Sequence, residues 1–189
     1  MTTGKRIVIA DYDPAWPAKF EAERDLIVRT CGAGAFVSIQ HVGSTSVPGL
    51  AAKPIIDMMP GVRSLDDAPP LVPLLESIGY EYVPEFEHDT PSGPGMPFRR
   101  YFRKDANGER AYHLHMVEVG SEFWVDHLLF RDYLRAHPDA ADEYAHLKRK
   151  IAANFNASMT PSSDINVGYT DRKTDFVERI KSRARAEAR

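Results

Sequence analysis

A polar turn enclosed by two apolar runs limits the folds open to this chain. Residues 36–42 are mostly β-branched and aromatic, and residues 55–59 are apolar apart from one acid, Asp57. These runs predict two buried strands, and the Gly43-Ser44 step after the first predicts a short helix or a nest of backbone N–H groups. An ionised carboxylate in an apolar strand is costly unless it is paired, hydrogen-bonded or bound to metal, so Asp57 requires a partner.

The turn between these strands combines groups that bind phosphate. Outward-pointing N–H groups attract anions, the three hydroxyl side chains add neutral donors, and a lysine adds positive charge. The alternative is an ordinary loop, in which the hydroxyls cap a helix and Asp57 pairs with a nearby cation, because short motifs match by chance. We predict that the phosphate or nucleotide site contains Gly43, Ser44, Thr45, Ser46 and Lys53.

Two histidines on a predicted hairpin form a second candidate site. Asn107-Gly108 favours a tight turn, and the strand after it carries His113 and His115 on one face because side chains alternate. Together with Asp57 they form a set of two imidazoles and one carboxylate that can hold a divalent metal (Mg, Mn or Zn) or contact a phosphate directly. Hydrogen-bonded packing histidines are the plainer alternative.

Composition narrows the classes of partner. The chain of 189 residues fits one domain, with its core at about 7–181, and its net charge of −3 argues against long nucleic acid. The single cysteine, Cys31, excludes an internal disulfide framework, and no apolar run approaches the length of a membrane span. The sequence does not specify an oligomeric state. From the charge, the single cysteine and the lack of a long apolar run, we expect a cytoplasmic protein that binds a small molecule or nucleotide, without long nucleic-acid or membrane partners.

The order of the elements predicts an α+β fold, in which a mixed β-sheet is flanked by helices and the C-terminal portion is helical. The expected elements are an edge strand at 6–10, a helix from Asp13-Pro14 to about Thr30, strands at 36–42, 55–59 and 80–83, a helix at 64–79, hairpin strands at 98–104 and 111–119, and helices at 121–136, 138–154 and 170–186. Residues 85–96, rich in Pro and Gly, predict a loop that covers the site and helps to select the substrate.

Four blocks of the chain, in order, resemble the GrpB family. They are His41–Asp57, Tyr112–Val117, His127–Leu134 and Tyr169–Phe176, and the similarity covers about residues 7–181. The family consists of small bacterial proteins grouped with the nucleotidyltransferase superfamily, and some members resemble the extra domain of certain dephospho-CoA kinases. The resemblance implies a nucleotidyltransferase-like fold, with a Gly-Ser turn followed by a strand that carries metal-binding acids.

The chain departs from the pattern of that superfamily at its acids. The superfamily places Asp-x-Asp or Asp-x-Glu on the strand after the turn and a further acid on a later strand, and these acids hold two divalent ions. Here Asp57 is followed by Met58 and Met59, and His113 or His115 takes the place of the later acid. The resemblance implies that Asp57, His113 and His115 are the catalytic and metal-binding residues. This set of ligands suits a transition metal better than Mg²⁺.

Further polar residues are candidates for ligand contact. At least one of Arg99, Arg100 and Arg103 can point toward the phosphate turn, and we take Arg100 as the candidate. By resemblance, Tyr169 and Lys173 contact a base or a triphosphate tail; a surface pair at i,i+4 is the plainer account. Asp126 and His127, on the first C-terminal helix, are expected to support the sheet histidines.

These features predict a nucleotidyltransferase-like enzyme that binds a nucleoside triphosphate on the Gly43–Ser46 turn and transfers a nucleotidyl group to a small-molecule acceptor. Two alternatives stay open. Met59 favours a non-catalytic module that binds a nucleotide or CoA-type metabolite and has lost two-metal chemistry. The histidines favour a metal- or histidine-dependent enzyme that acts on a small phosphorylated or acidic metabolite.

Overall fold

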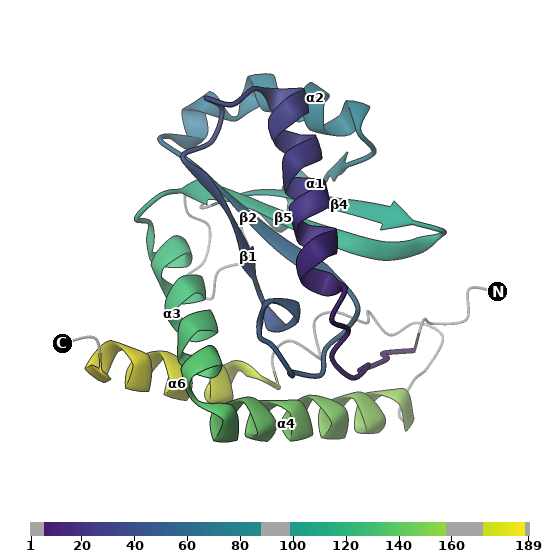
Figure 1. The fold of residues 1–189 in the computed structure, drawn as a ribbon, viewed down its shortest axis with the longest axis vertical. Helices are drawn as coiled ribbons and strands as arrows, with labels where there is room; N and C mark the ends of the chain where they lie inside the picture. The colour runs from purple at the N-terminus through teal and green to yellow at the C-terminus, as the bar shows by residue number, and fades with distance from the viewer. Residues whose placement is uncertain (1–5, 88–98, 158–171, 188–189) are drawn as a thin grey trace.

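The computed structural model describes residues 6–87, 99–157 and 172–187, and these contain a five-stranded mixed β-sheet. The spatial order of the strands is β1-β2-β5-β4-β3. Their bounds are β1 Ser38–Val42, β2 Ile56–Val62, β3 Glu81–Tyr82, β4 Arg100–Ala106 and β5 Glu109–Glu118. Helices flank this sheet (Figure 1), which confirms the α+β fold that the sequence predicts.

The strand pairing brings the two candidate sites together. β1 runs antiparallel to β2, and β2 runs parallel to β5 with Asp57 directly beside His113. β4 and β5 form the expected hairpin, and its turn residues Asn107 and Gly108 have the positive φ angles of 54° and 76° that a tight turn needs. The register of this hairpin shifts between Lys104 and Asp105, which marks a β-bulge.

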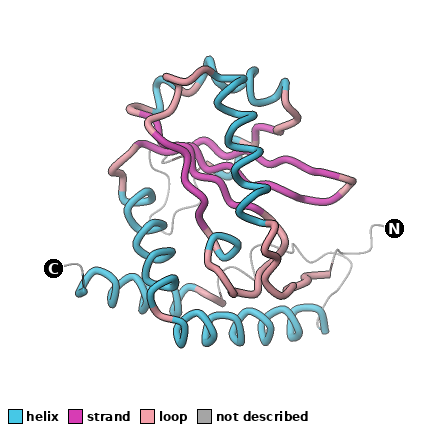
Figure 2. The backbone as a smooth tube through the Cα atoms, viewed as in Figure 1, coloured by secondary structure: helices cyan, strands magenta, loops and turns pink. Residues whose placement is uncertain are grey.

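Two helices cover one face of the sheet. α1 (Trp16–Cys31) crosses this face, and the shorter α2 (Val72–Ser77) lies at one end of the sheet (Figures 1 and 2). Phe20 and Ile27 are buried against the sheet, whereas Leu26 is half-buried. The largest buried side chains of this core are Trp16, Phe20, Ile27, Met58, Leu75, Phe102, Leu114 and Met116.

α1 begins three residues after its predicted cap. Asp13 Oδ1 accepts a hydrogen bond from the backbone N–H of Ala15 at 2.8 Å, and the helix starts at Trp16. The helix ends where Gly32 adopts a φ of +93°, a conformation that glycine adopts without steric cost. The helix predicted from Asp13-Pro14 to about Thr30 is therefore present, but its first residue was predicted too early.

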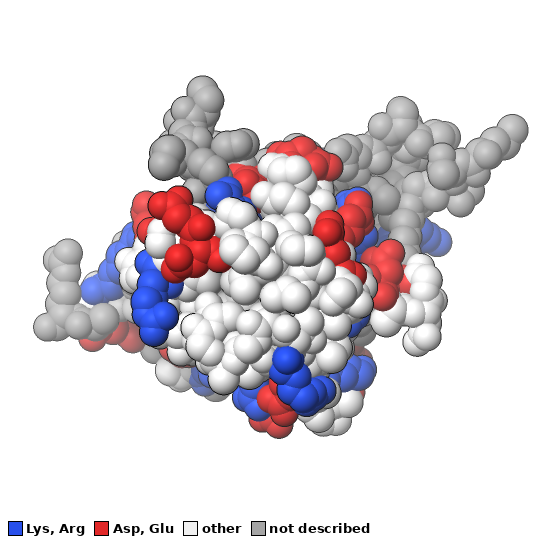
Figure 3. Space-filling model, turned by 90° about the horizontal axis from the view of Figure 1, so that it is seen from above, with Lys and Arg blue, Asp and Glu red and all other residues white. Residues whose placement is uncertain are grey.

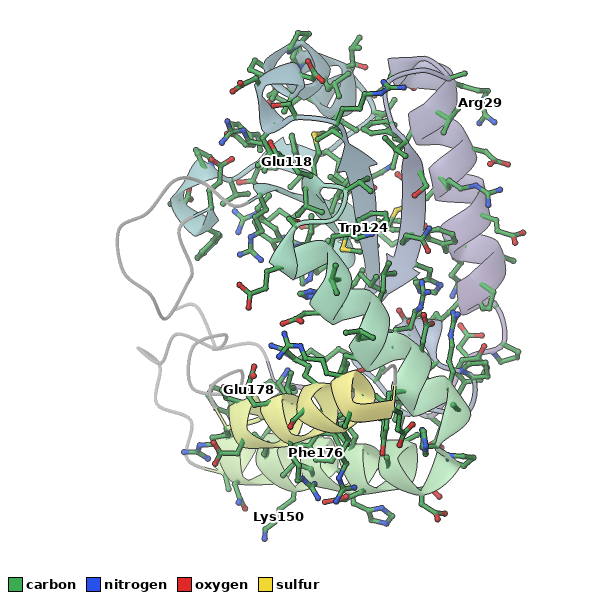
Figure 4. The ribbon with its side chains drawn as sticks, turned by 90° about the vertical axis from the view of Figure 1, so that its left-hand side faces the viewer. Arg29, Glu118, Trp124, Lys150, Phe176 and Glu178 are labelled. Carbon is green, nitrogen blue, oxygen red and sulfur yellow. The ribbon has the colours of Figure 1, made fainter. Side chains whose placement is uncertain are left out.

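α3 (Glu122–Ala136) packs on the opposite side of the sheet, and it is followed in the chain by α4 (Pro138–Ala157) and by α6 (Thr174–Glu187). Ser121 caps α3 as predicted, because its hydroxyl accepts the N–H of Trp124. α4 and α6 lie together below the sheet (Figure 1), and the rings of Tyr144 and Phe176 stack between them at 4.8 Å. Trp124 projects from α3 toward the strands (Figure 4).

Several predicted boundaries are wrong. Residues 6–9 form no strand, and the contact there is one bridge between Ala10 and Ala52. Three prolines break the helix predicted at 64–79 into two 3₁₀ turns, η2 (Leu65–Asp67) and η3 (Pro69–Leu71), followed by α2. Residues 88–96 of the predicted covering loop, and Tyr169, lie outside the described residues.

The charged side chains are unevenly placed on the surface. The end of the molecule that carries α2 is largely uncharged, with acidic and basic groups toward its rim (Figure 3). α4 and α6 lie at the other end of the sheet (Figure 1). Within the three described segments, no helix has the length and apolar character required to cross a membrane.

Candidate functional site

The turn after β1 packs directly against the acid of β2. Gly43 has a φ of +69°, and a Cβ built on it would overlap Asp57 Oδ2 and lie 2.9 Å from Asp57 Cγ. Ser44–Ser46 then forms a short 3₁₀ helix, η1. Glycine is therefore required at position 43 for two separate reasons, its backbone conformation and the close approach of the carboxylate.

Two of the three hydroxyls in the turn, those of Thr45 and Ser46, bind the backbone of the turn or of the segment that leads into β2. Thr45 Oγ1 donates to Ile55 O at 3.2 Å and lies 3.0 Å from His41 Nε2, whose N–H it can accept. Ser46 Oγ donates to Gly43 O at 2.6 Å. Both side chains are buried, so they brace the turn, and a role in ligand binding for them stays a prediction.

His41 is part of this support. Its ring is buried and stacks on Phe20 with the centroids 4.7 Å apart. Burial lowers the pKa of His41 to about 4, with help from the positive charges of Arg135 and Arg131 and against that of Asp57, so the imidazole is neutral near pH 7.

Two arginines of α3 hold the outside of the turn. Arg131 Nη1 donates to Gln40 Oε1 at 3.0 Å and to His41 O at 3.1 Å. Arg135 donates two hydrogen bonds to Ser46 O, at 3.0 and 2.8 Å. The turn is thus preorganised by side chains that are distant in the sequence, and these two supporting arginines are residues that the sequence analysis missed.

Asp57, His113 and His115 meet as predicted. His113 Nδ1 lies 3.2 Å from Asp57 Oδ1 and His115 Nε2 lies 4.0 Å from the same oxygen. Burial raises the pKa of Asp57, but the hydrogen bonds and charge of the two histidines outweigh it and hold the pKa well below its usual range. The carboxylate is therefore ionised near pH 7.

The cluster has the donor set of a single-ion site. One ligand atom from each of Asp57, His113 and His115 lies within 4.8 Å of the other two. Two imidazoles and a carboxylate suit Zn²⁺ or Mn²⁺ better than Mg²⁺, which prefers oxygen ligands. These residues therefore fit one transition-metal ion and do not provide the clustered acids of a two-magnesium centre.

Met59 shows why a second acid is missing. It lies two residues after Asp57 on the same face of β2, at the place where an Asp-x-Asp pair would put its second carboxylate. Its side chain is 0% exposed and packs with Val42, Val117 and Trp124 under α3. An acid there would be buried among apolar side chains.

Arg100, the arginine predicted to contact the ligand, lies on the face of the sheet away from the histidines. A two-residue hairpin without irregularity would place Arg100 opposite His115, but the bulge shifts the register by one residue and pairs Tyr101 with His115. Arg100 consequently faces the α1 side of the sheet, where Nη1 contacts Glu87 Oε2 at 2.8 Å. Arg99 faces the histidines instead, with Nη1 3.2 Å from His115 Nδ1.

A lysine that the sequence analysis missed contacts the turn. Lys148, on α4, is 2% exposed and donates to Ser44 Oγ at 2.9 Å and to Ala51 O. Burial lowers its pKa to about 7, and the positive charge of Lys173 acts in the same direction. Its signal in the sequence was its position on the apolar side of α4, four residues after the buried Tyr144.

Lys148 belongs to a group of three lysines, from three different segments, whose pKa values are influenced by the charge of Asp57. Burial lowers the pKa of Lys53, which precedes β2, and brings that of Lys173, just before α6, to about 8. The charge of Lys53 acts on Lys173, and Asp57 opposes the shift of each lysine. The predicted residues Lys53 and Lys173 therefore lie in one electrostatic environment with Asp57.

The expected supporting roles of Asp126 and His127 differ from the structure. Asp126 is buried between α3 and α6, where it pairs with Lys181 at 2.7 Å and with Arg185, so it docks α6 and does not reach the sheet histidines. His127 stacks on Phe123 at 3.8 Å, and its ring centroid lies 6.4 Å from that of His115. Only the histidine borders the cluster.

The fold is that of nucleotidyltransferases. A structure of a mutant Cid1 poly(U) polymerase bound to MgATP superposes with a TM-score of 0.52 at 12% identity, over 86% of this chain and 50% of Cid1. The chain belongs to the GrpB family, whose model, described as "GrpB protein", matches residues 6–183. The crystal structure of conserved protein GrpB from Enterococcus faecalis superposes with a TM-score of 0.78 at 33% identity, over 96% of this chain and 99% of that one.

Curated relatives include longer proteins. UPF0157 protein YqkA of Bacillus subtilis is 40% identical over 82% of this chain, and the chain spans 42% of the length of YqkA. A dephospho-CoA kinase of Mycolicibacterium paratuberculosis is 32% identical over 72% of this chain, which corresponds to 37% of the kinase. These matches confirm the resemblance to GrpB proteins and to part of dephospho-CoA kinases.

Proposed function

We propose that this protein binds a nucleoside triphosphate at the Ser44 turn and transfers a nucleotidyl group from it to a small-molecule acceptor. The observation that carries the proposal is that Lys148 contacts Ser44 of the turn, while Lys53, Lys148 and Lys173 share one electrostatic environment with the ionised Asp57. The nucleotidyltransferase fold supports it, because the turn, the following strand and the acid have the order that this fold uses.

Charge explains why the ligand would be a polyanion. Lys148 and Lys173 repel each other, as do Lys173 and Lys53, and burial removes water that would solvate the three ammonium groups. A triphosphate relieves both costs, because its oxygens pair with the ammonium groups and replace the lost water. The Ser44 hydroxyl and the N–H groups of the preorganised turn add neutral donors.

Asp57 and His113 are suited to act at the reacting phosphorus. Because the ionised carboxylate only accepts hydrogen bonds, His113 Nδ1 donates to Asp57 and the ring is fixed in orientation. One divalent ion held by Asp57 and His113, with the His113 proton moved to Nε2, would act as a Lewis acid on phosphate oxygens when bound. The lysines neutralise the charge of the leaving pyrophosphate.

Met59 favours a second candidate, a non-catalytic module that binds the same ligands. The apolar cluster around Met59 removes one acid of the two-metal arrangement, whereas the phosphate-binding groups of the turn are retained. Such a module would bind a triphosphate or a CoA-type metabolite, whose phosphates meet the same lysines, and would release no pyrophosphate.

Turnover separates the two functions. Wild-type protein and Asp57→Asn are incubated with each nucleoside triphosphate, Mn²⁺, Mg²⁺ or Zn²⁺, and mixtures of small-molecule alcohols, amines and acids, and pyrophosphate release is measured. We expect release by the wild type with one acceptor class and its loss in Asp57→Asn. Triphosphate binding without release in every mixture would replace the transferase with the binding module.

A further inference from the structure

A donor faces the outer nitrogen of one cluster histidine. Arg99 Nη1 lies 3.2 Å from His115 Nδ1. A guanidinium group has N–H donors and no acceptor, so the contact requires Nδ1 to be the accepting nitrogen without a proton. The neutral His115 ring then carries its proton on Nε2, the atom that faces Asp57 Oδ1 at 4.0 Å.

This tautomer is the wrong one for metal binding. A histidine that binds an ion through one ring nitrogen normally donates the N–H of the other nitrogen to a carboxylate, a carbonyl or water. If His115 bound an ion through Nε2, its proton would move to Nδ1 and point at the N–H groups of Arg99. Two donors would then face each other, with no acceptor between them.

Arg99 is held in place by contacts on its other sides. Its Nε and Nη2 donate to Phe86 O at 3.2 and 2.7 Å. Its guanidinium carbon lies 5.0 Å from the ring centroid of Tyr101 and 5.7 Å from that of Phe123. Moving Arg99 away from His115 would break these contacts, so the side chain opposes a change of tautomer.

We propose that Arg99 is a positioning residue that keeps the proton of His115 on Nε2. His115 then acts as a hydrogen-bond donor toward Asp57 and toward an anionic ligand. An ion at this cluster takes Asp57 and His113 as its protein ligands, because the His113 proton can move from Nδ1 to Nε2, whereas Arg99 opposes the corresponding change in His115. This inference rests on the metal site of the proposed function and sets its ligand number and its affinity.

The test measures Zn²⁺ affinity by competition with a chromophoric chelator. Arg99→Gln replaces the donor with a side chain whose Oε1 can accept a proton from Nδ1, whereas the matched control Arg99→Lys keeps a donor-only group. We expect Arg99→Gln to bind Zn²⁺ about ten- to a hundredfold more tightly than wild type, the usual scale of effects from groups that orient ligands. Arg99→Lys should stay near the wild-type value.

A cycle with His115→Ala shows which residues bind the ion. His115→Ala should leave the affinity of wild type within about twofold and abolish the gain of Arg99→Gln. If His115→Ala fails to fold, as thermal melting would reveal, His115→Phe is used because its volume is closer to that of histidine.

Two results would overturn the inference. One is a wild-type affinity that falls tenfold or more on removal of His115; the other is an Arg99→Gln variant that binds no more tightly than wild type. If Asp57→Asn also leaves the Zn²⁺ affinity unchanged, the metal site of the proposed function fails with it. If Asp57→Asn weakens binding, that site stands and only the role of Arg99 is rejected.

Discussion

Binding of a triphosphate should be coupled to proton uptake by two lysines. The pKa of Lys148 is lowered to about 7 and that of Lys173 to about 8, mainly by burial. At pH 8 these values leave roughly 0.1 proton on the Lys148 amine and roughly 0.5 on the Lys173 amine. A bound polyanion favours the charged form of both groups, so binding at pH 8 should take up roughly 1.4 protons at most.

The same values set the pH dependence of affinity. Between pH 8 and 9 the protonated fraction of the free protein falls roughly ninefold for Lys148 and roughly fivefold for Lys173, so the affinity should fall by up to about fiftyfold. The sign follows from the direction of the shifts. Both pKa values lie below the ordinary lysine value of 10.5 in the free protein, and the ligand raises them again.

Calorimetric titration with one nucleoside triphosphate at pH 8, in Tris and in HEPES, measures this uptake, because the two buffers differ in ionisation enthalpy. Lys148→Met should reduce the uptake to roughly 0.5 proton, the part assigned to Lys173. Lys150→Met is the matched control, because Lys150 is an exposed residue of the same helix (Figure 4). Equal binding enthalpies in both buffers, with an affinity that changes less than twofold between pH 8 and 9, would refute the reasoning.

Substitutions at three positions, two of them with a matched control, test how the fold holds the site. The free energy of unfolding is measured by urea denaturation. Gly43→Ala should destabilise the fold by about 1–2 kcal/mol for its φ of +69° and also abolish triphosphate binding, whereas Gly49→Ala, at φ +79° and in open space, should keep binding. Equal binding by both variants would contradict the contact with Asp57. Met59→Asp should cost about 3 kcal/mol or more, while Met59→Leu costs less than about 1.5 kcal/mol. Asp126→Asn should cost about 3 kcal/mol because it breaks two ion pairs with α6, and an unchanged midpoint would reject that docking role.

The candidate site was predictable from the sequence where side-chain alternation determines which residues share a face of a strand. Two histidines separated by one residue must share a face of a strand, and Asn107-Gly108 specifies the turn of their hairpin. The acid of the second apolar run needed a polar partner, and the parallel pairing of β2 with β5 supplies His113. Side-chain alternation and the cost of burying a carboxylate together indicated that these groups form one site.

The predictions that failed depend on a strand irregularity and on a tertiary contact, neither of which is specified by a local sequence pattern. The bulge between Lys104 and Asp105 reverses which arginines face the histidines, so Arg99 and not Arg100 lies at the site. Lys148 is separated from Ser44 by 104 positions, and only its place on the apolar side of α4 distinguishes it from the exposed Lys150 of that helix. Long-range packing decides both cases.

The measurement that tests the central claim most directly is a thermal-shift comparison of wild type and Lys148→Met with each nucleoside triphosphate and Mg²⁺, Mn²⁺, Zn²⁺ or chelator. At about a hundred times its dissociation constant, a ligand stabilises by roughly 2.7 kcal/mol, which at this chain length raises the melting temperature by several degrees. We predict such a rise for the wild type with one triphosphate and a rise at least halved in Lys148→Met. No rise with any triphosphate, or an equal rise in both proteins, would contradict a triphosphate site at the Ser44 turn.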